Sequence, residues 1–148
     1  MSSEKRRIDT INAIVTGSSI ANEVECSLVL GEFNEVHRCA RVSPDKRKHL
    51  LQVLHSTRAL DSALSAFIRV NSLQVRTPSL GSYIYSLAHH SSNGLQTLSS
   101  AERARFQSEI VDKRNKFMHE AGAYPNQVQV VNRLLSEMQT CLTRVAAL

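Results

Sequence analysis

Apolar residues recur at helical spacing along almost the whole chain, and this pattern constrains the fold more than any other feature. Ile8, Ile11 and Val15 share one face of a helix, and similar stripes follow in the later segments. No alternation of apolar and polar residues lasts long enough to predict a β-strand. Only five glycines and three prolines interrupt the 148 residues. The pattern therefore predicts an all-α protein.

Residues that start and stop helices divide this pattern into separate segments. Gly17 is suited to end the first helix, and Ser43-Pro44-Asp45 offers a capping hydroxyl followed by proline at the first helical position. Ser99 and Glu102 have the spacing of a capping box, which predicts a helix start near residue 100. The predicted helices cover about 4–16, 19–42, 44–75, 80–88, 100–121 and 125–147.

These segments predict a single domain, residues 1–148, folded as an all-α bundle of five to six helices. The connections are short, and the chain has no internal repeat. An apolar fraction of 42% is enough to build a hydrophobic core in a chain of this length. The predicted core includes Val24, Leu28, Phe33, Val53, Leu60, Leu64, Phe67, Phe106, Ile110, Val128, Leu134, Met138 and Leu142.

The balance of charges favours an acidic partner. The chain has 18 Lys and Arg against 13 Asp and Glu, a net charge of +5, and nucleic acid is the commonest partner of such proteins. The long helix starts with a basic segment, residues 46–49, which we interpret as a solvated face; an RNA-binding patch is the alternative. His89 and His90 point about 100° apart on a helix, and no carboxylate or cysteine lies nearby to complete a metal site. We therefore expect no metal and no cofactor.

The cysteines and the hydropathy pattern bear on the compartment. Cys26, Cys39 and Cys141 are odd in number and lack CxxC spacing, which argues against a disulfide framework or a cysteine zinc site. Small, buried apolar roles are expected for them. The sequence contains neither the apolar core of a signal peptide nor an apolar run of membrane-spanning length. These features predict a soluble, cytoplasmic protein without membrane contact.

One stretch, residues 113–122, concentrates reactive side chains at a predicted helix end. Asn115 and His119 are four residues apart and share a helix face, whereas Arg114 lies about 140° around the helix from His119. The arginine side chain is long enough to reach the same cleft. Gly122 is predicted to end this helix as its C′ residue, and Pro125 to open the last helix. A purely structural role is the alternative, because basic residues in a last turn also complement the helix dipole.

The residue types in this stretch match what RNA cleavage without a metal requires. A base must remove the proton of the ribose 2′-hydroxyl, an acid must protonate the leaving 5′-oxygen, and a cation must stabilise charge at the phosphorus. His119 is suited to the acid–base step and Arg114 to binding phosphate. One helix end supplies a single histidine, so two copies facing each other are expected to supply both acid and base.

The segment Arg114-Asn115-x-x-x-His119 resembles the R-x(4–6)-H signature of the HEPN superfamily, in which a polar residue, often asparagine, follows the arginine. Its position late in the penultimate long helix agrees with that family. The resemblance implies a HEPN-like fold, a two-fold homodimer and a metal-independent endoribonuclease. Arg114 would stabilise the phosphate, Asn115 would position groups, and His119 would act as acid or base. The neighbouring Lys113 and Lys116 are predicted to bind the RNA.

The same resemblance carries expectations about partners. Many HEPN proteins are toxins or antiphage-defence effectors that an antitoxin or regulatory protein holds in check. One large subgroup has tyrosine two positions after the histidine, where this chain has Ala121, which argues against regulation through that tyrosine. Other HEPN-like proteins are not enzymes. A non-catalytic helical interaction module or regulator is therefore the alternative function.

Overall fold

The fold was analysed in a computed structural model, which describes residues 2–90 and 95–148. Residues 91–94, in the connection between the predicted helices at about 80–88 and 100–121, lie outside the described residues. The described residues form helices and no strand, so the all-α prediction is confirmed. The elements are α1 (Ser3–Thr16), α2 (Val24–Arg38), η1 (Cys39–Arg41), α3 (Asp45–Val70), α4 (Leu80–His89), α5 (Ser100–Phe106), η2 (Gln107–Val111), α6 (Asp112–His119) and α7 (Val128–Ala146).

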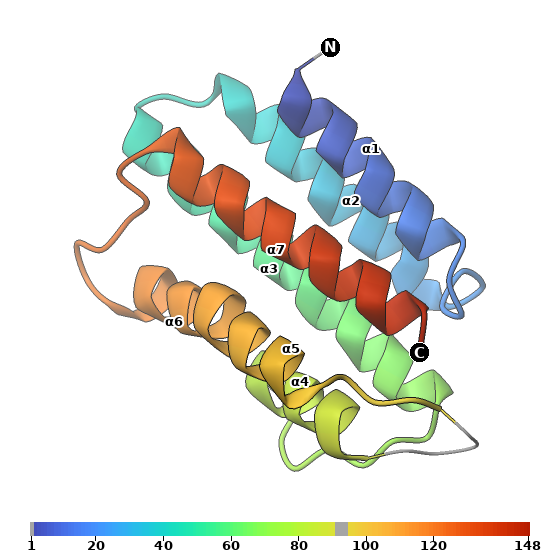
Figure 1. The fold of residues 1–148 in the computed structure, drawn as a ribbon. Helices are drawn as coiled ribbons and strands as arrows, with labels where there is room; N and C mark the ends of the chain where they lie inside the picture. Colours follow the sequence, from blue (N-terminus) through green and yellow to red (C-terminus); the bar gives the residue numbers. More distant parts are fainter. Residues whose placement is uncertain (1, 91–94) are drawn as a thin grey trace.

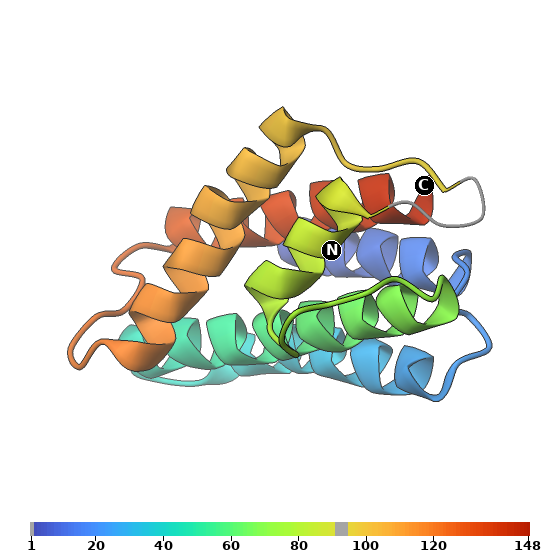
Figure 2. The same cartoon turned by 90° about the horizontal axis from the view of Figure 1, so that it is seen from below.

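The longest helix, α3, holds the bundle together. It packs against α2, α4, α6 and α7, while α1 covers α2 and α7. In Figure 1, α1, α2, α3 and α7 run alongside one another, and α5 to α6 pass across one side of this group. Figure 2 shows the α5–α6 segment inclined to the other helices, with α4 beside it. Because α3 contacts both parts, one face of α3 borders the segment that carries the predicted site.

Most of the predicted core is buried, but three of its members are not. Val24 is 75% exposed, Leu28 is 60% exposed and Val128 is 46% exposed, so the prediction was wrong for them. In α2 the buried stripe is Cys26, Val29, Phe33 and Val36, and its neighbours α1 and α3 cover that stripe alone. Apolar residues occupy more of the α2 surface than the neighbouring helices can cover. The apolar periodicity of α2 was therefore compatible with two different buried stripes. Packing against α1 and α3 buries the stripe that contains Val29 and leaves Val24 and Leu28 exposed.

The start of α5 is fixed by local hydrogen bonds and lies where the sequence predicted it. Ser99 Oγ accepts a hydrogen bond from the Glu102 N–H at 3.0 Å, and Glu102 Oε1 accepts one from the Ser99 N–H at 2.9 Å. This is the predicted capping box, and α5 begins at Ser100. Other boundaries were wrong: α2 begins at Val24, and α3 covers Asp45–Val70 with Pro44 at the N-cap position and no side-chain cap.

The start of α7 differs from prediction because Pro125 has another role. It is buried in the connection before α7, which begins at Val128 instead. The Nδ1 atom of His49 lies 2.9 Å from the Pro125 carbonyl oxygen and ties this connection to α3. His49 is itself buried, so the expectation that all of residues 46–49 form a solvated face was wrong at this position. The hydrogen bond satisfies a polar ring that burial would otherwise destabilise.

Helices α5, η2 and α6 are one continuous helix, from Ser100 to His119, with a π turn at its middle. The residues at both junctions keep right-handed helical backbone angles. A π turn contains more residues than an α-helical turn, so it shifts the faces of α6 relative to α5. Ile110 and Val111 in this turn are buried. The turn therefore helps to set which α6 residues face α3.

The sequence also led to predictions about the cysteines and about the hydropathy of the helices. Cys26, Cys39 and Cys141 are free and buried, as expected for small apolar core residues. Burial raises the pKa of the Cys141 thiol to about 12, so this group stays protonated. No helix within 2–90 or 95–148 combines the length and the apolar character needed to span a bilayer.

Candidate functional site

The predicted site lies where α6 meets α3. Arg114 is half-buried and lines a small pocket of about 180 Å³ together with Met118 of the same helix. Thr57, Asp61 and Ser62 of α3 form part of the opposite wall. Leu80 at the start of α4 also lines the pocket. The guanidinium of Arg114 is thus held at the junction of three helices.

A direct contact joins Arg114 to His119. The Nη1 atom of Arg114 lies 2.9 Å from Nε2 of His119 and donates a hydrogen bond to Asn115 Oδ1 at 3.1 Å. Arginine has only donors, so Nε2 of His119 accepts this hydrogen bond. The imidazole is then neutral, with its proton on Nδ1. The long arginine side chain spans the angular separation that helix geometry places between the two residues.

The three residues predicted to be catalytic therefore lie together, and Asn115 contacts Arg114. It shares a helix face with His119, but its side-chain oxygen accepts from the guanidinium. Asn115 and His119 are exposed, whereas Arg114 is half-buried. This arrangement fixes the guanidinium from two sides and leaves the histidine at the surface.

The chain leaves the helix directly after His119, the last residue of α6. Glu120 at the C-cap has an extended conformation, so the expectation that Gly122 is the C′ residue was wrong. Gly122 instead has φ +82° in a turn that the Ala123 N–H closes on the Glu120 carbonyl at 3.1 Å. Only glycine adopts such backbone angles without strain. This early exit exposes His119 at the end of the helix.

The two lysines predicted to bind RNA have different surroundings. Lys113 Nζ donates to Glu109 Oε2 at 3.0 Å, and the same carboxylate also accepts from Arg133. Hydrogen bonds from Arg133 and Lys113 hold the pKa of Glu109 below its ordinary value. Lys116 borders a separate hollow, of about 400 Å³, between α6 and the connection to α7. Neither lysine lines the pocket that contains Arg114.

Asp61 is a site residue that the sequence reasoning missed. It lines the Arg114 pocket from α3, and burial raises the pKa of its carboxyl, with the positive charge of Arg114 acting in the opposite direction. The signal in the sequence that could have indicated Asp61 was a pair of polar residues on an otherwise apolar side of α3. Thr57 and Asp61 are four residues apart and interrupt the apolar pattern of α3. Such interruptions on a core-facing side often indicate a functional role.

An apolar groove of about 480 Å³ adjoins the site. Five of its apolar side chains come from α3 and α6 and are partly buried: Leu50, Leu51, Leu54, Phe117 and Met118. The exposed Pro44, which precedes α3, also lines it. Leu54 and Met118 line both this groove and the Arg114 pocket. Lys46 and Arg47 form a basic border.

The arrangement of the histidines and the acidic side chains bears on metal binding. Across residues 2–90 and 95–148, no three His, Cys, Asp or Glu side chains come together in a way that could hold a metal ion. His89 stacks on Tyr85, with ring centroids 4.0 Å apart.

Compared with known protein families, with curated proteins and with solved structures, the chain matches none of them.

Proposed function

We propose that this protein is a metal-independent endoribonuclease of the HEPN type, with Arg114, Asn115 and His119 at its active site. The observation that carries the proposal is the 2.9 Å contact between Arg114 Nη1 and His119 Nε2. It joins a permanent cation that suits phosphate to a neutral imidazole at an exposed helix end. Metal-independent cleavage of RNA needs both groups at one phosphate.

The contact also supports an order of events. A phosphate of the RNA is a stronger acceptor than the imidazole, so it attracts the Arg114 guanidinium and releases Nε2 of His119. The free Nε2 removes the proton of the ribose 2′-hydroxyl, and the 2′-oxygen attacks the phosphorus. The bond to the 5′-oxygen breaks, that oxygen takes a proton from a protonated His119 of a second copy, and the phosphorus is left in a 2′,3′-cyclic phosphate. Arg114 stabilises the charge on the phosphate during this exchange.

A homodimer completes this proposal, because one chain supplies one histidine at the site. The apolar groove beside Arg114 supports a dimer formed by α3 and α6. Its partly buried side chains, among them Leu50 and Phe117, adjoin the pocket wall. Pairing of two such surfaces buries them and brings two His119 side chains toward one cleft, where one acts as base and the other as acid.

The test is cleavage of RNA by the purified protein in the presence of EDTA. Wild-type protein is expected to cut the RNA and to leave 2′,3′-cyclic phosphate ends, whereas His119→Ala is expected to be inactive with an unchanged circular dichroism spectrum. His37→Ala is the matched control, since His37 is an exposed histidine on α2, which packs against α1 and α3. Equal cleavage by wild type and His119→Ala would refute the proposal.

The apolar groove also favours a second candidate function, a non-catalytic helical interaction module or regulator. In that case the groove binds another protein, and Arg114 with His119 only stabilises the end of α6. Such a protein binds its partner without cutting RNA. An RNA-cutting toxin or antiphage effector held by an antitoxin combines both properties, and its expression is expected to arrest growth unless Arg114 is replaced by alanine.

A further inference from the structure

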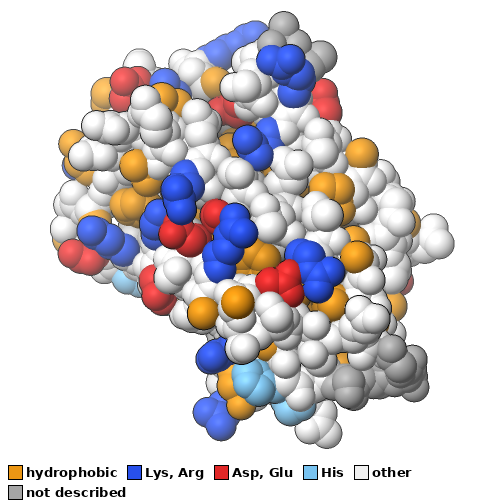
Figure 3. Space-filling model, viewed as in Figure 1, with side chains coloured by type: hydrophobic (Ala, Val, Ile, Leu, Met, Phe, Trp, Pro, Cys, Tyr) orange, Lys and Arg blue, Asp and Glu red, His pale blue; other side chains and the backbone are white. Residues whose placement is uncertain are grey.

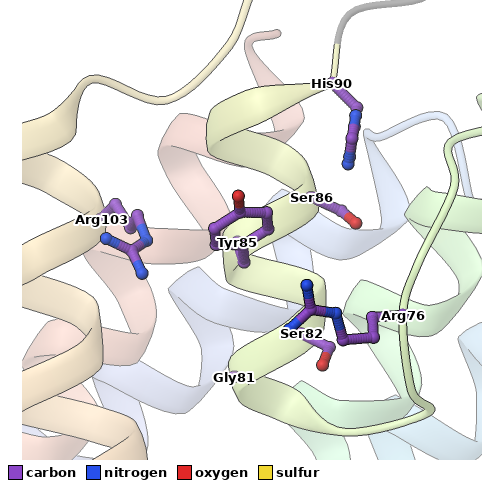
Figure 4. Close-up of a pocket in the computed structure, with 7 residues that line it drawn as sticks. All are labelled: Arg76, Gly81, Ser82, Tyr85, Ser86, His90 and Arg103. Carbon is purple, nitrogen blue, oxygen red and sulfur yellow. The ribbon is translucent and has the colours of Figure 1, made fainter.

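A second basic pocket lies on the other side of the first turn of α4. It has a volume of about 430 Å³ and is lined by Arg76, which precedes α4, by residues of α4, and by Arg103 of α5. In Figure 4 the two arginines approach from opposite sides, with Tyr85 between them and His90 above. The lining residues within the described part of the chain include no Asp or Glu. Such a pocket favours an anion.

Among the residues that the structure describes, six of the 13 arginines form ion pairs with carboxylates, and Arg76 and Arg103 are not among them. The arginines that form ion pairs are Arg38, Arg58, Arg69, Arg105, Arg133 and Arg144. The face in Figure 3 shows this arrangement, with basic and acidic side chains against one another. Within residues 2–90 and 95–148, neither Arg76 nor Arg103 lies within ion-pair distance of an acid. Both guanidinium groups therefore keep their donors for a ligand.

An aromatic ring positions one of these guanidinium groups. The Arg103 guanidinium carbon lies 5.2 Å from the centroid of the Tyr85 ring, a cation–π contact. Tyr85 is in turn stacked against His89 and lies edge-on to His90, with centroids 6.3 Å apart. A ring orients a cation without using its N–H groups. Arg103 is therefore held in place and can still bind a phosphate with its edge.

The position of the pocket links it to the proposed active site. Leu80 lines the Arg114 pocket, and the next residue, Gly81, lines this one, so the two hollows flank the start of α4. Arg103 and Arg114 belong to the same continuous helix, and eleven positions correspond to about 16 Å along its axis. A flexible chain with phosphates at regular intervals suits two basic hollows at this separation, whereas a single small anion occupies only one.

We propose that the pocket between Arg76 and Arg103 binds the backbone of single-stranded RNA and holds the strand beside the Arg114–His119 site. Arg76 and Arg103 contact phosphate, and the exposed ring of His90 offers a face to a base, while Tyr85 holds Arg103 in place. The choice of RNA rests on the proposed function, whereas the anion chemistry of the pocket does not. A free nucleotide shares this chemistry, so the experiment must separate the two ligands.

The experiment measures binding of a fluorescent 12-nucleotide 2′-O-methyl RNA, which has no free 2′-hydroxyl and cannot be cut by the proposed reaction. The double variant Arg76→Ala/Arg103→Ala is expected to bind at least about 10-fold more weakly than wild type. The slope of log K against log salt concentration is expected to fall by about 1.4, for two lost phosphate contacts on a single strand. Arg41→Ala, an exposed arginine without an acidic partner among the described residues, is the matched control.

Variants of Tyr85 separate a positioning role from nonspecific loss of charge. Tyr85→Ala removes the ring that holds Arg103 and is expected to weaken binding several-fold at an unchanged salt slope, whereas Tyr85→Phe keeps the ring and is expected to bind like wild type. AMP and inorganic phosphate serve as competitors. Failure of both to displace the RNA at millimolar concentration supports a strand-binding site, while displacement by AMP at micromolar concentration overturns it in favour of a nucleotide pocket.

The outcomes distinguish this inference from the proposed function. Unchanged affinity and salt slope in Arg76→Ala/Arg103→Ala overturn the RNA-binding pocket, even where His119→Ala abolishes cleavage. Conversely, a strong loss of binding in the double variant supports the pocket, even where wild type and His119→Ala cleave RNA equally and the nuclease proposal fails. Circular dichroism and thermal unfolding of each variant confirm that the exposed substitutions leave the fold intact.

Discussion

Asp61 on α3 and Arg114 on α6 line the same pocket, and the guanidinium only partly offsets the effect of burial on the carboxyl, whose pKa stays above its ordinary value. Two opposite charges at a helix junction usually lower the pKa of the acid. Here removal of the carboxyl from water is the larger influence. The pair therefore leaves Arg114 less fully neutralised than a tight ion pair would, which favours its availability to a phosphate.

The first prediction concerns the titration of Asp61. Arg114→Ala removes the opposing positive charge, so the pKa of Asp61 is expected to rise further, as followed by NMR of the carboxyl carbon. A raised pKa means that the folded state binds more protons, so this group's contribution to stability is present below the ordinary pKa of 3.8 and is lost as pH rises. Asp61→Asn is thus expected to gain stability relative to wild type as the pH rises above 3.8, measured by urea unfolding at several pH values. A pH-independent difference would contradict this.

Substitution of Arg114 by lysine tests whether geometry or charge matters at the site. Lysine keeps the positive charge but lacks the planar fork that reaches both Asn115 and His119. We expect Arg114→Lys to lower RNA cleavage roughly 10- to 100-fold while binding of RNA changes less. Arg41→Lys is the control, because Arg41 is an exposed arginine of η1 that does not line the pocket. Wild-type cleavage rates in Arg114→Lys would assign the residue a charge effect alone.

A third prediction addresses the dimer. Leu50→Glu places a charge in the apolar groove and is expected to convert a dimer to a monomer in analytical ultracentrifugation and to reduce RNA cleavage together with it. Leu28→Glu is the control, because Leu28 is exposed on α2 and lines none of the groove. A dimer that persists in Leu50→Glu, with unchanged cleavage, places the two-fold contact elsewhere.

The fourth prediction concerns stability at acid pH. The Arg144 guanidinium, followed by the Ser99 backbone N–H, lowers the pKa of Glu102 from 4.5 to about 2. The stability from this group is present above pH 4.5 and is lost as pH falls toward 2. Glu102→Gln keeps a capping side chain but removes the charge, so it is expected to be less stable than wild type at pH 7, with the difference narrowing between pH 4.5 and 2. Urea unfolding across this range measures it. The control is Glu35→Gln, whose ion pair with Arg38 is exposed.

Local signals in the sequence predicted what local interactions determine. The capping box at Ser99 needs only residues close in sequence, and it is present as predicted. The end of α6 at His119 was nearly right, but the Gly122 turn follows a different path because the chain must reach Pro125 and its contact with His49. That contact joins residues 76 positions apart, and no local pattern encodes it.

The proximity of the candidate site residues could be predicted because they lie on one helix. Arg114, Asn115 and His119 are close in sequence, so helix geometry and side-chain length were enough to bring them together. Asp61 and the apolar groove depend on how α3 packs against α6, which periodicity does not specify. Arg76 and Arg103 meet across α4 for the same reason. Their lack of acidic partners becomes visible only when all neighbours are in place.

The π turn at Gln107–Val111 makes the site sensitive to chain length and not only to residue identity. Removal of one residue from this turn allows a regular α-helix to form, and every residue after it then rotates by about 100°. The Arg114 side chain leaves the α3 pocket in such a protein, although all of its site residues are still present. A single inserted residue of this kind therefore decides which face of a helix carries its polar side chains.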